Sequence, residues 1–461
     1  MQNVIVKKLT VVTFASCLLV SACSSGNAAT RSSSSTKVTT TNQTTIKPGV
    51  PVDTVPAPED TQPDPEALAR NKECERVRPT TPKPSEFDSW DSPGVLTTSM
   101  DIDSEGNTIV TGLMSDEHDF DLTSERKTVG VDGWSFKFLA KFNQNQEFMW
   151  MKCQGEKTLF HFYIGPTVST DAAGNIYQCD AGLSKFSPAG KLLWSTASDA
   201  LSCATNASGE SVLAKIAEAH FVDTNGKTIW SAKNCSCSAA TFTRKGNIFL
   251  GSQTGITKLS TSGKRLWGVS FTTRDVEVDG AIFGPNGYAE GNAVSTDQVG
   301  IGTDKDNNIV FVFSLNLKND VDPSSQTKYL KPGWIQDVAI AKYTAGGKLL
   351  WAQKVKIPKT IAKTTRYSEG YDISFMPNGD IIALGGGKLG KNADQDLRHP
   401  GLRLFLAKFT TDGEQTRFMW LGEYDSFIHN MGHHIVTDTN GRTYVTSVGE
   451  KLPPFLISRD M

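Results

Sequence analysis

The stretch Gly190-Lys-Leu-Leu-Trp194 decides the fold, because the chain returns to the same phrase several times. It recurs as Gly226-Lys-Thr-Ile-Trp230, Gly263-Lys-Arg-Leu-Trp267 and Gly347-Lys-Leu-Leu-Trp351. Further tryptophans in a similar setting are Trp90, Trp150 and Trp420. Each tryptophan is expected at the end of one repeated β unit, where it packs against a neighbouring unit and carries no chemistry.

A tight-turn signal opens each unit, between two short runs that alternate apolar and polar residues as strands do. Asp or Asn opens such a turn, and Gly or Asn tolerates the positive φ that it needs. The signal occurs at Asp103–Asn107, Asp171–Asn175, Asn206–Gly209, Thr243–Asn247, Asp304–Asn308, Pro377–Asp380 and Asp438–Gly441. A second pair of strands follows each turn, as in Leu139-Ala-Lys-Phe142.

Two hairpins per unit make a four-stranded blade, so the repeats predict an all-β, seven-bladed β-propeller over residues 86–461. The last unit reaches Phe455–Ser458 and has no strand with a tryptophan after it. Phe87-Asp-Ser-Trp90 supplies such a strand near the other end of the chain. We therefore predict that this N-terminal strand completes the last blade.

These phrases resemble the repeats of bacterial β-propeller families, both a lipoprotein-associated type and a quinoprotein-like type with a Gly-Lys-x-x-Trp signature. The resemblance implies a propeller fold. Quinoprotein dehydrogenases also carry two adjacent, disulfide-bonded cysteines over the quinone, and this chain has no adjacent cysteines. No cofactor is therefore predicted. The chain is also similar in style to the lipid-anchored propeller of the outer-membrane protein assembly machinery, which is a scaffold without catalysis.

Residues 1–22 predict a lipoprotein signal peptide, because two lysines precede an apolar run that ends at Val20-Ser-Ala-Cys23. Cys23 would then become the palmitoylated N-terminus, and Ser24 fits sorting to the outer membrane by resemblance to other lipoproteins. Ordinary secretion with Cys23 as a thiol is the alternative. Residues 23–85 are rich in Ser, Thr and Pro, which predicts a disordered tether. We expect a lipid-anchored protein of the bacterial cell envelope.

Insertions interrupt the units at Met114–Ser135, Thr272–Thr296, Ser314–Trp334 and Gly385–Leu402. All of them fall in connections that leave one face of the predicted ring. Because binding residues concentrate on loops held by a rigid scaffold, we expect the binding surface on the loops of blades five, six, seven and one. Its candidate residues are Asp116, Glu117, His118, Asp119, Trp334, Lys388, Lys391, Arg398 and His399. The charged ones could equally pair with one another.

Motifs for chemistry are weak. Gly385-Gly-Gly-Lys-Leu-Gly-Lys391 partly matches a P-loop, but no helix pattern follows it, so no nucleotide is predicted. His433 and His434 fall in the innermost strand of the last unit, where alternation sends one ring into the channel and the other into the blade. A channel imidazole could bind a metal with Asp101 or Asp103, but ordinary hydrogen bonds explain a single histidine equally well, and no metal site is predicted.

Six cysteines follow Cys23 and are candidates for disulfides in an exported protein. They are Cys74, Cys153, Cys179, Cys203, Cys235 and Cys237. A bond from Cys203 to Cys235 or Cys237 would join neighbouring blades, although the sequence cannot select one pairing among roughly 15. Cys235 and Cys237 could instead form a metal or redox pair.

A formal charge of −2 without a basic block argues against nucleic acid as a partner. We expect a non-catalytic binding or scaffold module for an envelope protein or polysaccharide. One alternative is an enzyme that acts on a polysaccharide or small ligand at the channel mouth, where ionisable residues would converge. Another is a structural surface lipoprotein without a dedicated ligand.

Overall fold

The computed structural model describes part of the chain, all of it within one compact unit that runs from Gln62 to Met461. The described residues are 65–79, 95–120, 127–156, 166–180, 182–197, 200, 202–215, 218–233, 238–252, 255–271, 276–278, 281–283, 299–333, 336–358, 365–389, 402–424, 433–446 and 455–458. The predicted signal peptide and Cys23 lie outside them.

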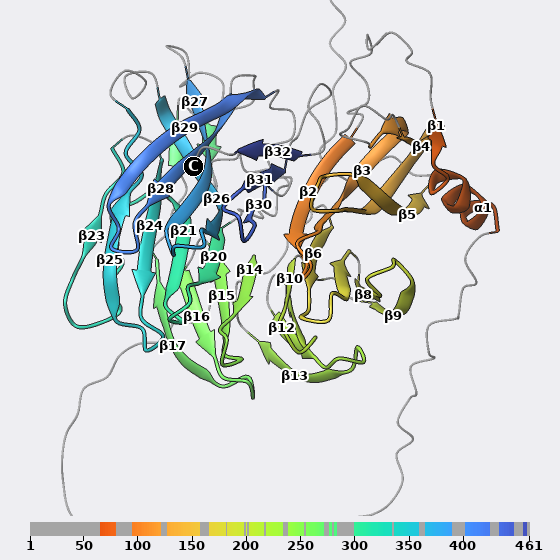
Figure 1. The fold of residues 1–461 in the computed structure, drawn as a ribbon. Helices are drawn as coiled ribbons and strands as arrows, with labels where there is room; N and C mark the ends of the chain where they lie inside the picture. The colour runs from red at the N-terminus through yellow and green to blue at the C-terminus, as the bar shows by residue number, and fades with distance from the viewer. Residues whose placement is uncertain are drawn as a thin grey trace, which may run out of the picture. The chain divides into compact units, whose positions relative to one another are not determined.

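Six blades of four antiparallel strands follow one another along the chain, and we number them 1 to 6 (Figure 1). The sheet of blade 1 has a fifth strand, β1 (Arg78–Pro79), which pairs with its third strand. Blade 1 consists of β2 (Val95–Ile102), β3 (Thr108–Asp119), β4 (Lys127–Phe142) and β5 (Phe148–Glu156). Blade 2 consists of β6 (Thr167–Thr170), β7 (Ile176–Cys179), β8 (Gly182–Phe186) and β9 (Leu192–Ala197). Blade 3 consists of β10 (Ser202–Thr205), β11 (Ser211–Ala214), β12 (Glu218–Val222) and β13 (Thr228–Lys233). Blade 4 consists of β14 (Ala239–Phe242), β15 (Ile248–Ser252), β16 (Gly255–Leu259) and β17 (Arg265–Ser270). Blade 5 consists of β20 (Gly300–Thr303), β21 (Ile309–Leu315), β24 (Asp337–Tyr343) and β25 (Leu349–Lys354). Blade 6 consists of β26 (Thr365–Phe375), β27 (Ile381–Leu389), β28 (Leu402–Phe409) and β29 (Gln415–Tyr424).

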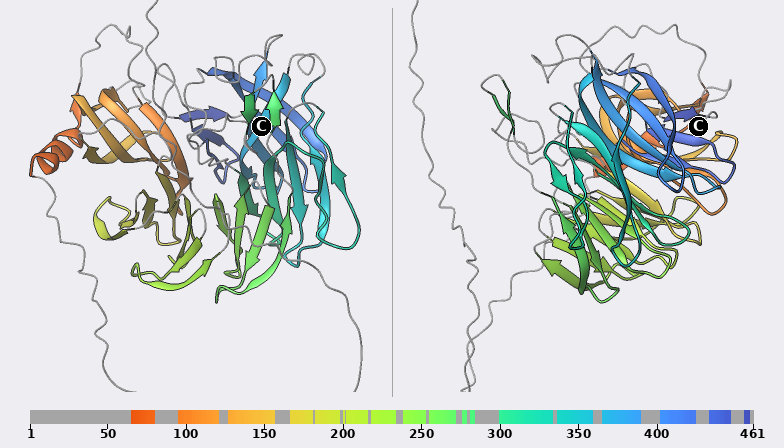
Figure 2. Two further views of the ribbon diagram at one scale, coloured as in Figure 1. Left: turned by 180° about the vertical axis from the view of Figure 1, so that it is seen from behind. Right: turned by 90° about the vertical axis from the view of Figure 1, so that its left-hand side faces the viewer.

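A smaller sheet of three strands closes the ring. It consists of β30 (Ile435–Thr437), β31 (Thr443–Thr446) and β32 (Phe455–Ser458). The first strand of each blade packs against the first strand of the next, and β30 packs against both β26 and β2 (Figures 1 and 2). The fold is therefore a β-propeller, with its core between successive blades.

The prediction of seven four-stranded blades is wrong in its count, since the structure has six such blades and this three-stranded sheet. The strand Phe87–Trp90, expected to complete the last blade, lies outside the described residues. Two insertions contain short hairpins, β18 (Val276–Val278) with β19 (Ala281–Phe283) and β22 (Asn319–Asp320) with β23 (Tyr329–Leu330). The insertion of blade 1 extends β3 and β4, which pair as far as Asp119 and Thr128.

The turns between first and second strands, and between third and fourth strands, share one hydrogen-bond pattern. The first residue donates its N–H to the fifth, and the fourth donates to the first, as in the turn that begins at Ser187. The fourth residue takes a positive φ, for example 78° at Gly190. Residues other than Gly, Asn or Asp are strained at a positive φ, which explains why Gly or Asn recurs at this position of the turn signal. All of these turns leave one face of the ring, the short-turn face, and the remaining connections leave the opposite loop face.

The recurring tryptophans join each blade to the next, as predicted. The Trp194 ring lies so close to Gly226 of the following blade that a Cβ atom there would be about 3.0 Å from it. The Trp194 indole donates to the carbonyl oxygen of Thr224 in the same turn at 3.1 Å, and Trp230, Trp267 and Trp351 repeat this bond one blade further on. Gly and Trp therefore recur together, because the glycine leaves the space that the preceding tryptophan fills.

A buried lysine of the third strand supports the first turn in several blades. Lys141 contacts Asp103 at 2.8 Å in blade 1, and Lys342 contacts Asp304 at 3.0 Å in blade 5. Burial opposes ionisation of these carboxyl groups, but their hydrogen bonds to Lys and Asn hold the pKa values of Asp103 and Asp304 below the ordinary range.

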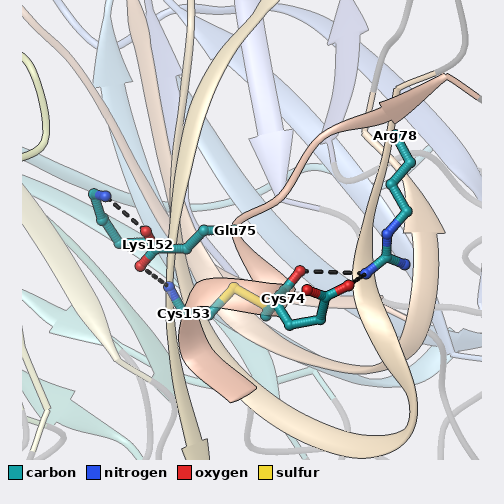
Figure 3. Close-up of a disulfide and its surroundings, with 6 residues drawn as sticks. Cys74, Glu75, Arg78, Lys152 and Cys153 are labelled. Carbon is teal, nitrogen blue, oxygen red and sulfur yellow. Dashed lines mark hydrogen bonds and ion pairs between the residues drawn. A yellow bond between two sulfur atoms is a disulfide. The ribbon is translucent and has the colours of Figure 1, made fainter. Parts of the chain in front are cut away.

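One segment of the predicted tether is folded. Helix α1 (Pro65–Cys74) and β1 (Arg78–Pro79) pack on blade 1, within the segment 23–85 that the sequence predicts as a tether. Cys74 forms a disulfide with Cys153 in β5 (Figure 3). The Arg78 guanidinium lies 2.7 Å from the carboxylate of Glu73 and 2.6 Å from that of Glu117. The helix formers of Pro65-Glu-Ala-Leu-Ala-Arg70 and the cysteine were the available signals.

Candidate functional site

The channel of the propeller is formed by the first strands, whose unpaired backbone edges face inward. We define the channel ring as the seven residues that lie four positions before each first turn. They are Ser99, Thr167, Ser202, Ala239, Gly300, Asp372 and His434. Most of these side chains are small or carry one hydroxyl group. Asp372 and His434 are the ionisable members, and they lie next to each other in the ring.

Asp372 joins blade 6 to the three-stranded sheet. Its Oδ1 accepts the N–H of Ile373 at 2.8 Å, and its Oδ2 accepts the N–H of Ile435 at 3.1 Å. His434 Nδ1 lies 3.2 Å from the same Oδ2. At the equivalent place in blade 1, Ser99 Oγ accepts the N–H of Val168 at 3.1 Å. Asp372 thus retains a bond of the repeat and adds a carboxylate beside an imidazole.

A second carboxyl group, Asp101 of β2, lies in the wall of the same cavity. It accepts hydrogen bonds from Thr170 Oγ1 of blade 2 and from the N–H of Ile102, each at 2.8 Å. Burial raises the pKa of Asp101 to about 6, and the two hydrogen bonds only partly offset this effect. Asp101 can therefore gain or lose a proton near neutral pH.

These groups face a cavity of about 700 Å³. Much of its wall carries hydroxyl groups, and Ser169 and Thr205 form a hydrogen bond of 2.8 Å within it. The cavity reaches the first turns of blades 3 and 4, where Glu210, Arg244 and Lys245 line it. It therefore extends to the short-turn face, opposite the loop face where the insertions led us to expect binding.

The two histidines have different environments. His433 is buried and packs on Tyr371, with 4.6 Å between ring centroids, whereas His434 lines the cavity. Of the suggested carboxylate partners, Asp101 lines the cavity but Asp103 is engaged with Lys141. Within the part of the chain that the structure describes, no group of three or more His, Cys, Asp or Glu side chains is placed to hold a metal ion.

The structure describes the side chains of the predicted loop-face residues only in blade 1. Asp116, Glu117, His118 and Asp119 end β3, and the Glu117 carboxylate binds Arg78. The His118 ring is 2.5 Å from the carbonyl oxygen of Ser115, and Asp119 is exposed. Lys388 lies in β27. Trp334, Lys391, Arg398 and His399 lie outside the described residues. Of the described members, Glu117 thus supports the packing of residues 65–79.

The expected bond from Cys203 to Cys235 or Cys237 is a wrong prediction for Cys203, which has a free thiol. Cys203 lies beside the free thiol of Cys179, and burial raises the pKa of Cys179 well above its ordinary value. Cys235 and Cys237 lie outside the described residues. Both cysteines are buried in one hydrophobic cluster, where they act as small apolar side chains of the core.

Comparison with known proteins identifies solved structures but no family. No protein-family model matches the chain. No curated protein matches it either. A catalytically inactive virginiamycin B lyase from Staphylococcus aureus, with quinupristin, is 9% identical, with a TM-score of 0.44 over 83% of this chain and 98% of that one. A protein of unknown function from Bacteroides caccae is 11% identical, with a TM-score of 0.34 over 70% and 96%. The Pan2 WD40 domain of Neurospora crassa is 8% identical, with a TM-score of 0.40 over 79% and 89%.

No helix among the described segments is long and apolar enough to cross a bilayer.

Proposed function

We propose that this chain is a lipid-anchored binding propeller of the bacterial cell envelope that holds a saccharide in its channel. The observation that carries the proposal is the convergence of Asp101, Asp372 and His434 on a cavity of about 700 Å³. Cavities of this size suit small ligands, and a few placed polar groups then fix the ligand's orientation. Ionisable groups that meet in the channel are what we expect of a small-ligand site.

The lining favours a ligand rich in hydroxyl and amino groups. Carboxylates accept hydrogen bonds from both, and they pair with a protonated amine. The hydroxyl groups of Ser169 and Thr205 both donate and accept, and the partly buried ring of Phe242 offers aromatic surface to a sugar ring. An amino sugar matches all three kinds of group. An anionic sugar would instead meet the carboxylates at the channel ring and be disfavoured there.

Binding can be tested with glucosamine, N-acetylglucosamine and galacturonate as probes. We expect calorimetric binding of glucosamine, weaker binding of the uncharged N-acetyl sugar, and none of galacturonate. Asp372→Asn keeps an acceptor for Ile435 but removes the charge, so it should weaken glucosamine selectively. Absence of binding for all three probes would contradict the proposal.

The loop face remains a second proposed surface, for a protein or polysaccharide of the envelope. The support is topological, because the insertions after β3, β21 and β27 all connect second to third strands and so leave the same face. The disulfide between Cys74 and Cys153 also fixes residues 65–79 against the extended hairpin of blade 1. Co-purification after cross-linking, with and without a shortened hairpin, tests this surface.

Acid–base catalysis on a saccharide is the alternative activity of the channel. The specific observation in its favour is the 3.2 Å contact between His434 Nδ1 and Asp372 Oδ2, beside Asp101, whose pKa burial raises to about 6. A group with such a pKa can serve as a general acid or base near neutral pH. Mass spectrometry of oligosaccharides incubated with the native chain and with His434→Ala would reveal turnover. Unchanged oligosaccharides would leave binding as the role of the channel.

The anchor and the location are part of the proposal. Cys23 would carry the lipid, and the outer membrane would hold it. Incorporation of labelled palmitate into the native chain, and its loss in Cys23→Ser, is the expected result. Labelled palmitate in Cys23→Ser at the native level would contradict this assignment.

A further inference from the structure

One position of the repeat reverses its charge around the ring. It directly follows the positive-φ residue of the turn between third and fourth strands. In blades 2 to 5 it is occupied by Lys191, Lys227, Lys264 and Lys348. In blades 1 and 6 it is occupied by Glu147 and Glu414. All six residues are exposed, so the short-turn face has a basic arc over blades 2 to 5 and an acidic arc over blades 1 and 6.

Further cations strengthen the basic arc. Arg244, Lys245 and Lys305 lie in its first turns and are exposed, and the exposed acid in those turns is Asp306. Within the described ranges, none of the four repeat lysines forms a salt bridge with another side chain. Unpaired cations that project from one face give that face a positive potential.

Aliphatic side chains accompany these lysines. Two residues after each lysine, the fourth strand carries a large apolar residue that is about half exposed. These residues are Leu193 at 47%, Ile229 at 54%, Leu266 at 48% and Leu350 at 45%. Apolar groups that recur on an exposed surface beside cations are typical of proteins that bind a membrane interface.

We propose that the basic arc docks the propeller onto an anionic lipid surface. The lysines would meet phosphate headgroups, and the four aliphatic side chains would enter the boundary between headgroups and acyl chains. A soluble polyanion would engage only the lysines and leave the aliphatic side chains in water, so the pairing of the two favours lipid. This docking requires neither a ligand in the channel nor the lipid on Cys23. The proposals of docking, of a channel ligand and of lipidation can therefore fail independently of one another.

The test uses unlipidated residues 24–461, which contain the whole folded unit, with two kinds of vesicle. One is phosphatidylcholine, and the other also contains phosphatidylglycerol. We expect co-sedimentation with the anionic vesicles only, and its loss at high salt. Replacing the four repeat lysines by Gln should reduce vesicle binding by roughly tenfold or more. The matched control, Glu147→Gln with Glu414→Gln, should bind at least as well as the native chain.

A third variant separates lipid from other polyanions. Leu193→Ser, Ile229→Ser and Leu266→Ser together should weaken binding to anionic vesicles and leave retention on heparin unchanged. Thermal unfolding verifies that every variant is folded, since all of the replaced side chains are exposed. Equal binding to both vesicles, or full binding of the four-lysine variant, would overturn the proposal. Heparin retention with no effect of the serine substitutions on vesicle binding would assign the arc to an anionic polymer instead.

Discussion

The basic and acidic arcs of the ring have the same strands and turns but different chemistry. Blades 2 to 5 have hydroxyl or small side chains in the channel ring and lysines on the short-turn face. Blades 1 and 6, with the three-stranded sheet between them, carry Asp101, Asp372 and His434 in the channel and glutamates on that face. The disulfide-bound helix also belongs to this second arc. Repetition therefore explains the scaffold, and departures from it mark the places where function is expected.

The largest expected effect comes from the disulfide that only blade 1 has among the described blades. The double variant Cys74→Ser, Cys153→Ser should lose about 3–4 kcal/mol of unfolding free energy, because the bond spans 79 residues of chain. Chemical denaturation measures this loss. Cys179→Ala in blade 2 is the control, since it removes a buried thiol without a bond and should cost roughly 1 kcal/mol. Equal losses would show that the bond between the helix and β5 contributes nothing beyond the packing of its sulfur atoms.

Asp372→Ala should destabilise the acidic arc by about 2–3 kcal/mol, because buried N–H groups of two residues lose their acceptor. Ser99→Ala, at the same ring position in blade 1, removes the equivalent bond from Val168 and should cost about 1 kcal/mol. Thermal unfolding of the two variants side by side gives the difference. If the two losses were the same, the carboxylate would be no more important to the joint between sheets than a hydroxyl group.

Asp101 predicts that the stability of the acidic arc depends on pH. Its folded pKa of about 6 exceeds the ordinary value of 3.8, so the folded state holds the proton more tightly than the unfolded state. The corresponding stability is complete below about pH 4 and is lost as the pH rises through about 6. Asp101→Asn should flatten this part of the profile and add about 2 kcal/mol at pH 7 relative to the native chain. Parallel profiles for variant and native chain between pH 4 and 7 would rule out this group as the cause.

The smallest expected effect comes from giving blade 4 the Asp–Lys pair that blades 1 and 5 have. Blade 4 has Thr243 where blade 1 has Asp103, and its buried Lys258 donates to the carbonyl oxygen of Ala345 instead. Burial lowers the pKa of Lys258. Thr243→Asp should raise that pKa and stabilise the fold by about 0.5–1 kcal/mol, measured by denaturation at pH 7. Thr243→Asn is the uncharged control, and equal stability of both variants would show that the charge pair has no net effect.

The sequence predicts the scaffold well because each repeat contains the residues that form its own turn and its own contact with the next blade. The Gly of one blade and the Trp of the preceding blade appear as fixed phrases, and their spacing is a local property of the chain. The blade count was overestimated because a strand far away in the sequence had to be assigned to the last sheet. Residues 65–79 were missed because a short helix held by a disulfide looks like any other polar segment before Cys153 is known to lie beside it.

The candidate site was predicted only in part. Alternation along one strand indicated that His433 and His434 would differ, and Asp101 was considered as a channel carboxylate. Asp372 was missed because its sequence context has no motif, and only superposition of the turns shows that it replaces a serine of the repeat. The cavity on the short-turn face could not be predicted either. The long insertions predict binding on the opposite face, and the short turns have no sequence feature that indicates a cavity opening.

The most direct test of the proposed channel site is a thermal-shift titration with glucosamine, performed on the native chain, Asp101→Asn and Asp372→Asn. A channel that binds an amino sugar through its carboxylates predicts a Tm that rises with glucosamine concentration in the native chain and a much weaker rise in both variants. A native Tm that does not change with glucosamine, or equal rises in all three proteins, would contradict the proposal that this arc of the channel is a saccharide site.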